Sequence, residues 1–198
     1  MPLLTPADPV PATATTLALK EWGAAALALL EGRQTVLLRK GGIHEKRFEV
    51  GDHRFVLFPT VAHSHLERVR PEHRDLVQRG MADVDAEGGA FTVRCGLSVI
   101  DVVTVTRPDR LAAIEDLHIW TADSVRQDRL DFRPKQALQV LVVRAVALPH
   151  VARLPRLEEY GGCKSWVDLP VAWDGEGRVA CDDGRLAEDA RRVRAEVS

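Results

Sequence analysis

The sequence predicts an α+β fold, in which helices cover the outside of a mixed or antiparallel sheet. Three observations support this prediction. The chain of 198 residues is 45% hydrophobic, which is enough to bury one core. Runs rich in valine and leucine, typical of strands, are interspersed with segments of helical periodicity. The chain also contains no internal repeat and no heptad pattern.

The first predicted helix covers residues 17–31 and leads into the first strand. Leu19, Trp22 and Leu29 fall on one face at helical spacing. Gly32 stands where a helix-ending glycine belongs. Residues 35–39 are β-branched or aliphatic before the final arginine, which favours a buried strand.

The remaining elements follow from similar signals. Proline and glycine residues separate apolar runs along the rest of the chain. We expect strands at 53–58, 91–94, 97–106 and 137–148, and helices at 71–80, from 107, at 124–130 and at 186–197. The strands at 35–39, 53–58, 97–106 and 138–148, with the first helix, should form the core.

The chain divides into three predicted segments. Residues 1–16 hold four prolines and many small residues, a composition that favours a flexible arm. Residues 17–170 form a single α+β domain. Residues 171–198 begin rich in glycine and acidic residues and end in the last helix, whose apolar stripe can dock on the body or on a partner protein.

Charge and composition exclude several classes of protein. The net charge of −2 argues against non-specific coating of nucleic acid, although it leaves room for a small basic patch. The apolar runs are too short to cross a bilayer, and the N-terminus lacks the pattern of a signal peptide. Cys95, Cys163 and Cys181 are widely spaced and form neither a disulfide framework nor a metal pair. We therefore expect a cytoplasmic protein.

The best candidate for an anion site follows the first strand. Uncovered backbone amides beside converging cations suit a phosphate group. The residues are Arg39, Lys40, Gly41, Gly42, Lys46 and Arg47. The alternative is an ordinary charged turn, in which Glu45 and Glu49 pair with the cations.

A second candidate surrounds Gly161 and Gly162. Tyr160 or Trp166 can stack on a base, and Lys164 can contact a phosphate. The alternative is a turn whose tryptophan fills the core.

The sequence favours no metal and no cofactor. His63 and His65, with His73, could bind zinc only if they converged, but the first two fall in an expected loop without a thiol or carboxylate at suitable spacing. His118 lies between apolar residues, as a core histidine does. Cys163 fits a small buried thiol better than a nucleophile.

Three segments together resemble an uncharacterised bacterial family, domain of unknown function 1802. They read GRQTVLLRKGGIHEKRFEV with the following LFPT, HIWT…LDFRPKQALQVLVVRAVAL, and YGGCKSWVDL. The resemblance spans about residues 17–169 and implies no activity, because none is assigned to that family.

A local stretch also resembles the ASCH domains of the PUA-like group, which carry G-x-K-x-x-E-x-R between a helix and a strand. Gly32 and Arg39 match this signature, whereas Gln34 replaces its lysine and Leu37 its glutamate. Gly51–Asp52 and the following strand resemble the GD strand that often comes next in such domains. The resemblance implies a sheet that can close into a PUA-like β-barrel. Loss of the lysine and glutamate argues against the hydrolytic chemistry known in that group and leaves a binding role open.

We therefore expect a binding module for RNA, DNA or a nucleotide-like ligand, with Arg39 and Lys40 on phosphate and Tyr160 or Trp166 stacking near Lys164. Whether the two Gly-Gly segments meet depends on the fold. One alternative is a metal-dependent nuclease or phosphodiesterase that uses Glu21, Glu49 and Asp101, although the E-x-K that such nucleases need is missing. Another is a structural adaptor that docks through the C-terminal helix.

Overall fold

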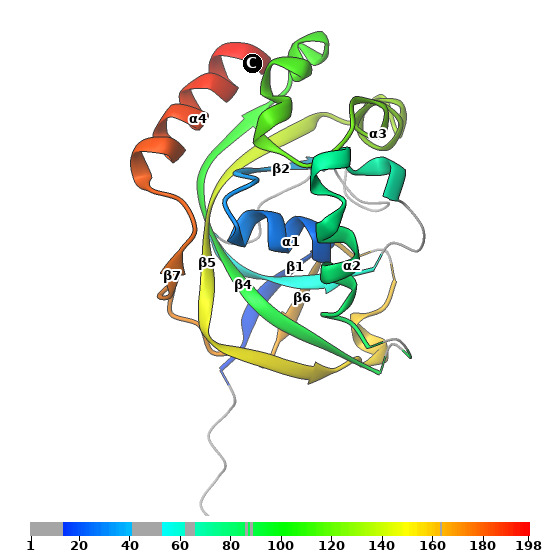
Figure 1. Ribbon diagram of the computed structural model, residues 1–198, viewed down its shortest axis with the longest axis vertical. Coiled ribbons are helices and arrows are strands. Elements are labelled where there is room, and N and C mark those ends of the chain that lie inside the picture. The colour runs from blue at the N-terminus through cyan, green and yellow to red at the C-terminus, as the bar shows by residue number, and fades with distance from the viewer. Residues whose placement is uncertain (1–13, 41–52, 62–65, 86, 88, 163) are drawn as a thin grey trace, which may run out of the picture.

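The computed structural model in Figure 1 describes residues 14–40, 53–61, 66–85, 87, 89–162 and 164–198. The predicted α+β fold is confirmed. The elements are β1 (Thr16–Trp22), α1 (Gly23–Leu30), β2 (Val36–Lys40), β3 (Arg54–Thr60), η1 (Leu66–Arg68), η2 (Pro71–His73), α2 (Asp75–Met81), β4 (Ala90–Thr104), η3 (Pro108–Leu117), α3 (Ala122–Val125), η4 (Arg126–Asp131), β5 (Leu138–Pro155), η5 (Glu158–Tyr160), β6 (Trp166–Leu169), β7 (Arg178–Val179) and α4 (Asp183–Val197). Element η4 is a π-helix and the other η elements are 3-10 helices.

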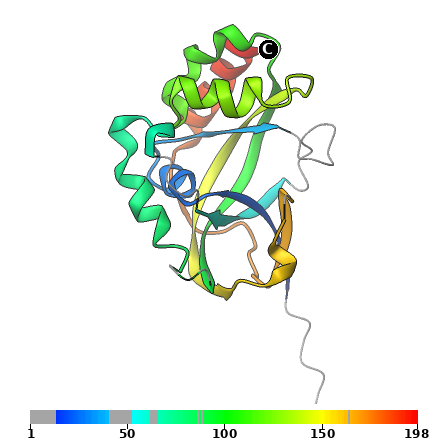
Figure 2. The same cartoon turned by 90° about the vertical axis from the view of Figure 1, so that its right-hand side faces the viewer.

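The strands form one mixed sheet in the order β2-β5-β4-β3-β1-β6, with β7 on β5. Strands β1 and β3 are parallel, and the other pairs are antiparallel. The register of β4 against β5 shifts between Val93 and Cys95 and again between Val99 and Asp101. Such irregularities bend strands, and both views show the sheet curving around α1 (Figures 1 and 2).

The sheet does not close into a barrel. Its terminal strands in the described part of the chain, β2 and β6, do not pair with each other. The outward carbonyls of β2 already have side-chain donors, because Gln34 Nε2 lies 2.8 Å from the oxygen of Val36 and Arg129 Nε lies 3.1 Å from that of Leu38. These side chains occupy the outer edge of β2, where a further strand would have to pair. Instead, a guanidinium nitrogen of Arg39 lies 3.3 Å from the carbonyl oxygen of Lys20 in β1.

The prediction of one helix over residues 17–31 is wrong for its first half. Residues 16–22 form β1, which pairs with β3 from Ala18 to Trp22 and with β6 from Thr16 to Leu19. A short apolar run is compatible with the periodicity of a helix or of a strand. Pairing with the distant strands β3 and β6 makes this run a strand. The helix begins at Gly23 because the following run is almost entirely alanine and leucine, which favour helices. Gly32, at φ +69°, ends it as predicted.

Other elements differ from the prediction mainly in their limits. Strand β4 is continuous where two strands were expected, and β5 extends through Pro149. The helix expected at 124–130 divides into α3 and the π-helix η4, whereas the strands expected at 35–39 and 53–58 are confirmed within two residues.

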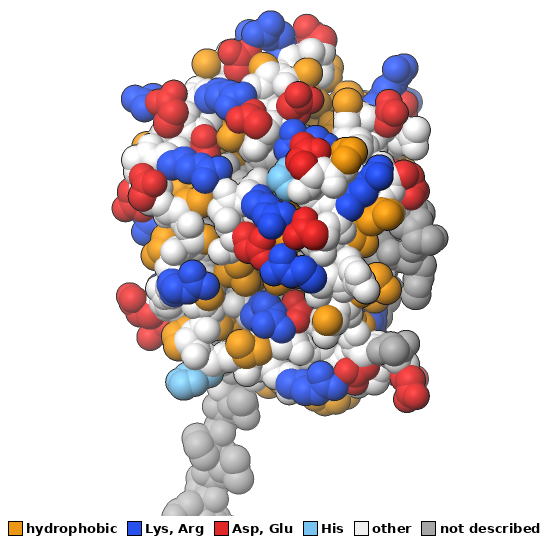
Figure 3. Space-filling model, in the orientation of Figure 1, with side chains coloured by type: hydrophobic (Ala, Val, Ile, Leu, Met, Phe, Trp, Pro, Cys, Tyr) orange, Lys and Arg blue, Asp and Glu red, His pale blue; other side chains and the backbone are white. Residues whose placement is uncertain are grey.

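The surface carries interspersed charges on the face shown in Figure 3. Pairs such as Arg33 with Asp75 and Arg192 with Asp116 bring opposite charges together. No helix in the described part of the chain is both long and apolar enough to cross a membrane.

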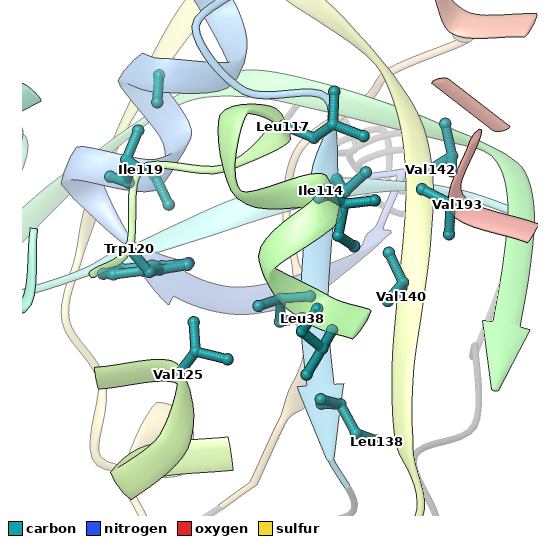
Figure 4. Close-up of a cluster of buried hydrophobic side chains, with 14 of the residues drawn as sticks. Leu38, Ile114, Leu117, Ile119, Trp120, Val125, Leu138, Val140, Val142 and Val193 are labelled. Carbon is teal, nitrogen blue, oxygen red and sulfur yellow. The ribbon is translucent and has the colours of Figure 1, made fainter. Parts of the chain in front are cut away.

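The C-terminal helix α4 contributes to the main core. Val193 is fully buried beside Val142 and Ile114 (Figure 4). Val197 is fully buried in the same cluster. Asp189 of α4 is also buried, and it accepts a 2.8 Å hydrogen bond from the hydroxyl of Thr35. The division of the chain at residues 170 and 171 stays a prediction.

Candidate functional site

A cavity of about 310 Å³ opens beside the end of β1. We call it the tryptophan cavity. Its walls come from β1, η1, the segment before α3, α3 itself, and η4 with the residue that follows it. The lining residues are Trp22, Arg68, Trp120, Ser124, Val125, Gln127, Asp128, Arg129 and Phe132.

Two tryptophans form the aromatic part of this cavity. The ring centroids of Trp22 and Trp120 lie 5.0 Å apart, and the rings are perpendicular. Trp120 is 7% exposed and packs beside Val125 in the main core (Figure 4). Thr121 caps α3 directly after it, with its hydroxyl accepting a 3.2 Å bond from the Ser124 amide. Buried packing and the cap therefore hold the aromatic wall in place.

Two arginines flank the tryptophans. Arg68 forms an ion pair with Asp128 across the cavity wall. Arg129 donates from Nε to the carbonyl of Leu38, at 3.1 Å. Burial lowers the pKa of Arg129, the carboxylate of Glu21 opposes this shift, and the guanidinium of Arg39 adds to it. Because an arginine remains charged in proteins, this partly desolvated cation would gain from an anionic ligand.

Arg39, one of the predicted phosphate ligands, acts on the cavity through Glu21. A guanidinium nitrogen of Arg39 lies 3.1 Å from Oε2 of Glu21, whose side chain is 4% exposed. The other carboxylate oxygen of Glu21 accepts a 2.9 Å hydrogen bond from the amide of Trp22. The buried pair therefore fixes the backbone that carries Trp22.

Lys40, the other predicted phosphate ligand, supports a second wall. Its ammonium group donates to the carbonyls of Arg129, at 2.6 Å, and Phe132, at 2.7 Å. Burial lowers its pKa, the nearby Arg129 lowers it further, and Asp131 opposes the shift. Lys40 thus fastens the end of η4 to β2. Gly41, Gly42, Lys46 and Arg47 lie outside the described residues.

The second predicted site lies apart from the cavity lining. Tyr160 is buried against Phe58 and Phe91, with centroid distances of 5.9 and 6.0 Å, and burial raises its pKa. Trp166 is half-buried and packs edge-to-face on Phe55. Lys164 is exposed.

Lys20 connects the two predicted sites. Its ammonium group donates to the carbonyls of Gly161 and Gly162, at 3.3 and 3.2 Å. Its own carbonyl accepts the bond from Arg39. Arg39 and the Gly161-Gly162 carbonyls therefore bond to the same residue of β1, and Lys40 donates to Arg129 and Phe132 of the tryptophan cavity.

The remaining histidine and thiol candidates do not form a site in the described residues. His73 Nε2 lies 3.1 Å from a guanidinium nitrogen of Arg70, and His118 is 2% exposed. His63, His65 and Cys163 fall outside the described part. Within it, no three histidine, cysteine or acidic residues gather as metal ligands do.

The carboxylates of the nuclease alternative have separate partners. Asp101 on β4 accepts two hydrogen bonds from Arg194 of α4, at 2.7 and 2.6 Å, whereas Glu21 pairs with Arg39. Glu49 lies outside the described residues. The described geometry therefore favours structural ion pairs for both carboxylates.

The two departures from the ASCH signature also have structural roles. Gln34 is 1% exposed, donates to the carbonyl of Val36 and lies with Oε1 3.3 Å from the amide of Ile119. Leu37 is 1% exposed in the core. Gln34 therefore forms buried hydrogen bonds where the signature has lysine, and Leu37 packs in the core where the signature has glutamate.

Sequence reasoning missed most of the cavity. The helical spacing placed Trp22 on a helix face, and Trp120 belonged to a short apolar segment without a role. The sequence feature that could have indicated the cavity is the run RQDRLDF at residues 126–132. It combines closely spaced charged side chains with a phenylalanine. Arg68 came from an unassigned segment and had no local signal.

Comparison with known proteins gives one family and two solved structures. The model of a family described as domain of unknown function (DUF1802) matches residues 18–192. A crystal structure of ASCH from Zymomonas mobilis aligns at 12% identity and a TM-score of 0.43, covering 92% of this chain and 95% of that one. A crystal structure of a mutant ZmASCH protein from the same organism aligns at 13% identity and a TM-score of 0.39, covering 65% of this chain and 66% of that one. No curated protein matches.

Proposed function

The chain belongs to the DUF1802 family, and from this starting point we propose that it binds nucleic acid or a nucleotide-like ligand in the tryptophan cavity. One observation carries the proposal: Trp22 and Trp120 line a single cavity together with Arg68 and Arg129. Aromatic rings beside cations are what a base with its phosphate requires.

The cavity is large enough for a small ligand or for one part of a larger ligand. Its volume of about 310 Å³ lies at the lower end of the range for ligand pockets, about 300–1,000 Å³. That space suits one base with its sugar better than a folded nucleic acid. The site is therefore suited to a nucleotide or to an unpaired base of a strand.

Charge supports a local interface. The net charge of −2 and the interspersed charges of Figure 3 provide no broad basic surface on the face shown. Arg68 and Arg129 line the cavity together with one carboxylate, that of Asp128, so these three side chains leave a net positive charge at the cavity. We expect few phosphate contacts and hence only a weak dependence of affinity on salt.

A cytoplasmic location is part of the same proposal. Cys95 is buried and Cys181 is half-buried, and both are free thiols. Reduced thiols are usual in the cytoplasm.

Titration of the protein with a fluorescein-labelled RNA or DNA octamer, single-stranded and of mixed sequence, and with 5′-AMP tests the proposal. We expect binding of at least one probe. Trp22→Leu should weaken it by about 5- to 150-fold, because stacking on an aromatic side chain contributes about 1–3 kcal/mol per base.

Arg68→Ala provides a second variant that leaves the tryptophans in place, and it should also weaken binding. Arg191→Ala removes one cation from the exposed face of α4 and is the matched control. Absence of binding to every probe, or equal affinity of Arg68→Ala and Arg191→Ala, would refute the proposal.

A further inference from the structure

We infer that Phe132 and Arg133 form a second stacking position at the rim of the tryptophan cavity, so that the ligand is a single strand with at least two consecutive nucleotides. This inference rests on the proposed function and specifies its ligand. It predicts that a mononucleotide fills only part of the site.

Phe132 is an aromatic side chain with an exposed ring at the cavity. It is 51% exposed and lines the tryptophan cavity together with Arg129. An exposed phenylalanine adds little to a core, and stacking platforms for unpaired bases use such rings. Its position at the rim lets a second base stack outside the cavity while the first lies inside.

The backbone under Phe132 is fixed. Its carbonyl oxygen accepts a 2.7 Å hydrogen bond from the Lys40 ammonium group, which also holds the carbonyls of Arg129 and Leu130. Phe132 directly follows the π-helix η4, and π-helices occur frequently at functional sites. The platform is therefore held before a ligand arrives, which lowers the entropic cost of binding.

Arg133 adopts a backbone conformation that costs energy. Its φ of 51° makes it the one residue other than glycine with positive φ in the described ranges. An arginine in this left-handed region is less stable than a glycine by about 1 kcal/mol. Strained residues of this kind cluster at functional sites.

The side chain of Arg133 lies against the Phe132 ring. The guanidinium carbon of Arg133 lies over the Phe132 ring, 4.9 Å from its centroid. A cation so close to a stacking ring can contact the phosphate of a base that stacks there. Arg129, three residues before Phe132 on the same wall, is placed for the phosphate that links the two nucleotides.

Binding of 5′-AMP, the dinucleotide ApA and an adenine octamer, measured by calorimetry on the full chain, tests this inference. We expect the wild-type protein to bind ApA about tenfold or more tightly than 5′-AMP, as one further stacked base provides. Phe132→Ala should abolish this gain, so that this variant binds ApA and 5′-AMP with affinities within about twofold of each other.

Arg133→Gly is the second variant. It should lower the affinity for ApA while stability stays the same or rises, because glycine relieves the strained φ. Val179→Ala, at a similarly exposed apolar residue on β7, is the control and should change neither affinity.

The outcomes separate the two proposals. If 5′-AMP and ApA bind equally well, or if Phe132→Ala binds ApA as the wild type does, the second position is refuted and the proposed function stands. If no probe binds, both are refuted.

Discussion

His118 is kept neutral by its surroundings. It is 2% exposed, and its Nδ1 accepts a 3.2 Å hydrogen bond from the amide of Trp120. Burial lowers its pKa to about 4, and Arg70 adds to the shift while Asp116 opposes it. The ring therefore carries its proton on Nε2 at neutral pH and holds the backbone of a cavity tryptophan.

This shift predicts a dependence of stability on pH. Between the unfolded pKa of 6.5 and the folded value of about 4, the unfolded chain binds a proton that the folded chain excludes, so stability falls as pH falls. From about pH 7.5 to pH 5 the loss from this group should be about 2 kcal/mol. Urea unfolding of the wild type and His118→Asn at both pH values measures it.

The difference between the two proteins isolates the histidine, because carboxylates and His73 titrate in both. A pH dependence of His118→Asn equal to that of the wild type would show that His118 is not the source.

At the scale of elements, helices α1 and α2 pack against each other at two glycines, Gly23 and Gly80. A Cβ on Gly80 would lie 2.4 Å from the backbone nitrogen of Ala24, and one on Gly23 would lie 2.4 Å from the carbonyl oxygen of Gly80. Backbone atoms cannot move aside as a side chain does. The approach of the helices therefore requires both glycines.

Gly80→Ala should accordingly destabilise the protein, although alanine in a helix normally gains about 1 kcal/mol over glycine. We expect a loss of about 1–3 kcal/mol from the overpacked contact, measured by urea unfolding. Gly89→Ala, where an added Cβ meets no atom within 4 Å, should stay within about 0.5 kcal/mol of the wild type. A Gly80→Ala protein as stable as this control would contradict the close approach.

At the scale of the whole molecule, α4 completes the core that begins with α1. Val193 of α4 packs with Val142 of β5 and Ile114 of η3, as Figure 4 shows. The stripe expected to dock on the body or on a partner is buried in the body. The exposed side of α4 carries charged residues such as Arg191 and Glu188.

Val193→Ala should therefore lower the free energy of unfolding by about 2 kcal/mol, because it removes two buried methyl groups and leaves a cavity. Arg191→Ala, two residues away on the exposed side, should change it by less than about 0.5 kcal/mol. Denaturant unfolding with both variants decides the matter, and equal stabilities would mean that α4 is not part of the core in solution.

The predicted parts of the fold were those whose signals lie close together in the chain. The valine- and leucine-rich runs predicted β2, β3 and β5, and Gly32 predicted the end of α1, because both rest on neighbouring residues. Family membership also followed from the sequence alone. For the cavity, the sequence indicated Arg39 and Lys40 as important cations. In the structure Arg39 pairs with Glu21 and Lys40 donates to the carbonyl of Arg129 in η4, and their contact with phosphate stays a prediction.

The amino-acid sequence by itself determined the α+β class, most strands, the C-terminal helix and the family. Tertiary structure decided that residues 16–22 are a strand, that the sheet stays open at β2, and that Trp22, Arg68, Trp120 and Arg129 share one cavity. The reason is physical. A strand, a sheet edge and a cavity wall depend on partners distant in the chain, and an apolar run such as TLALKEW fits a helix or a strand until β3 pairs with it.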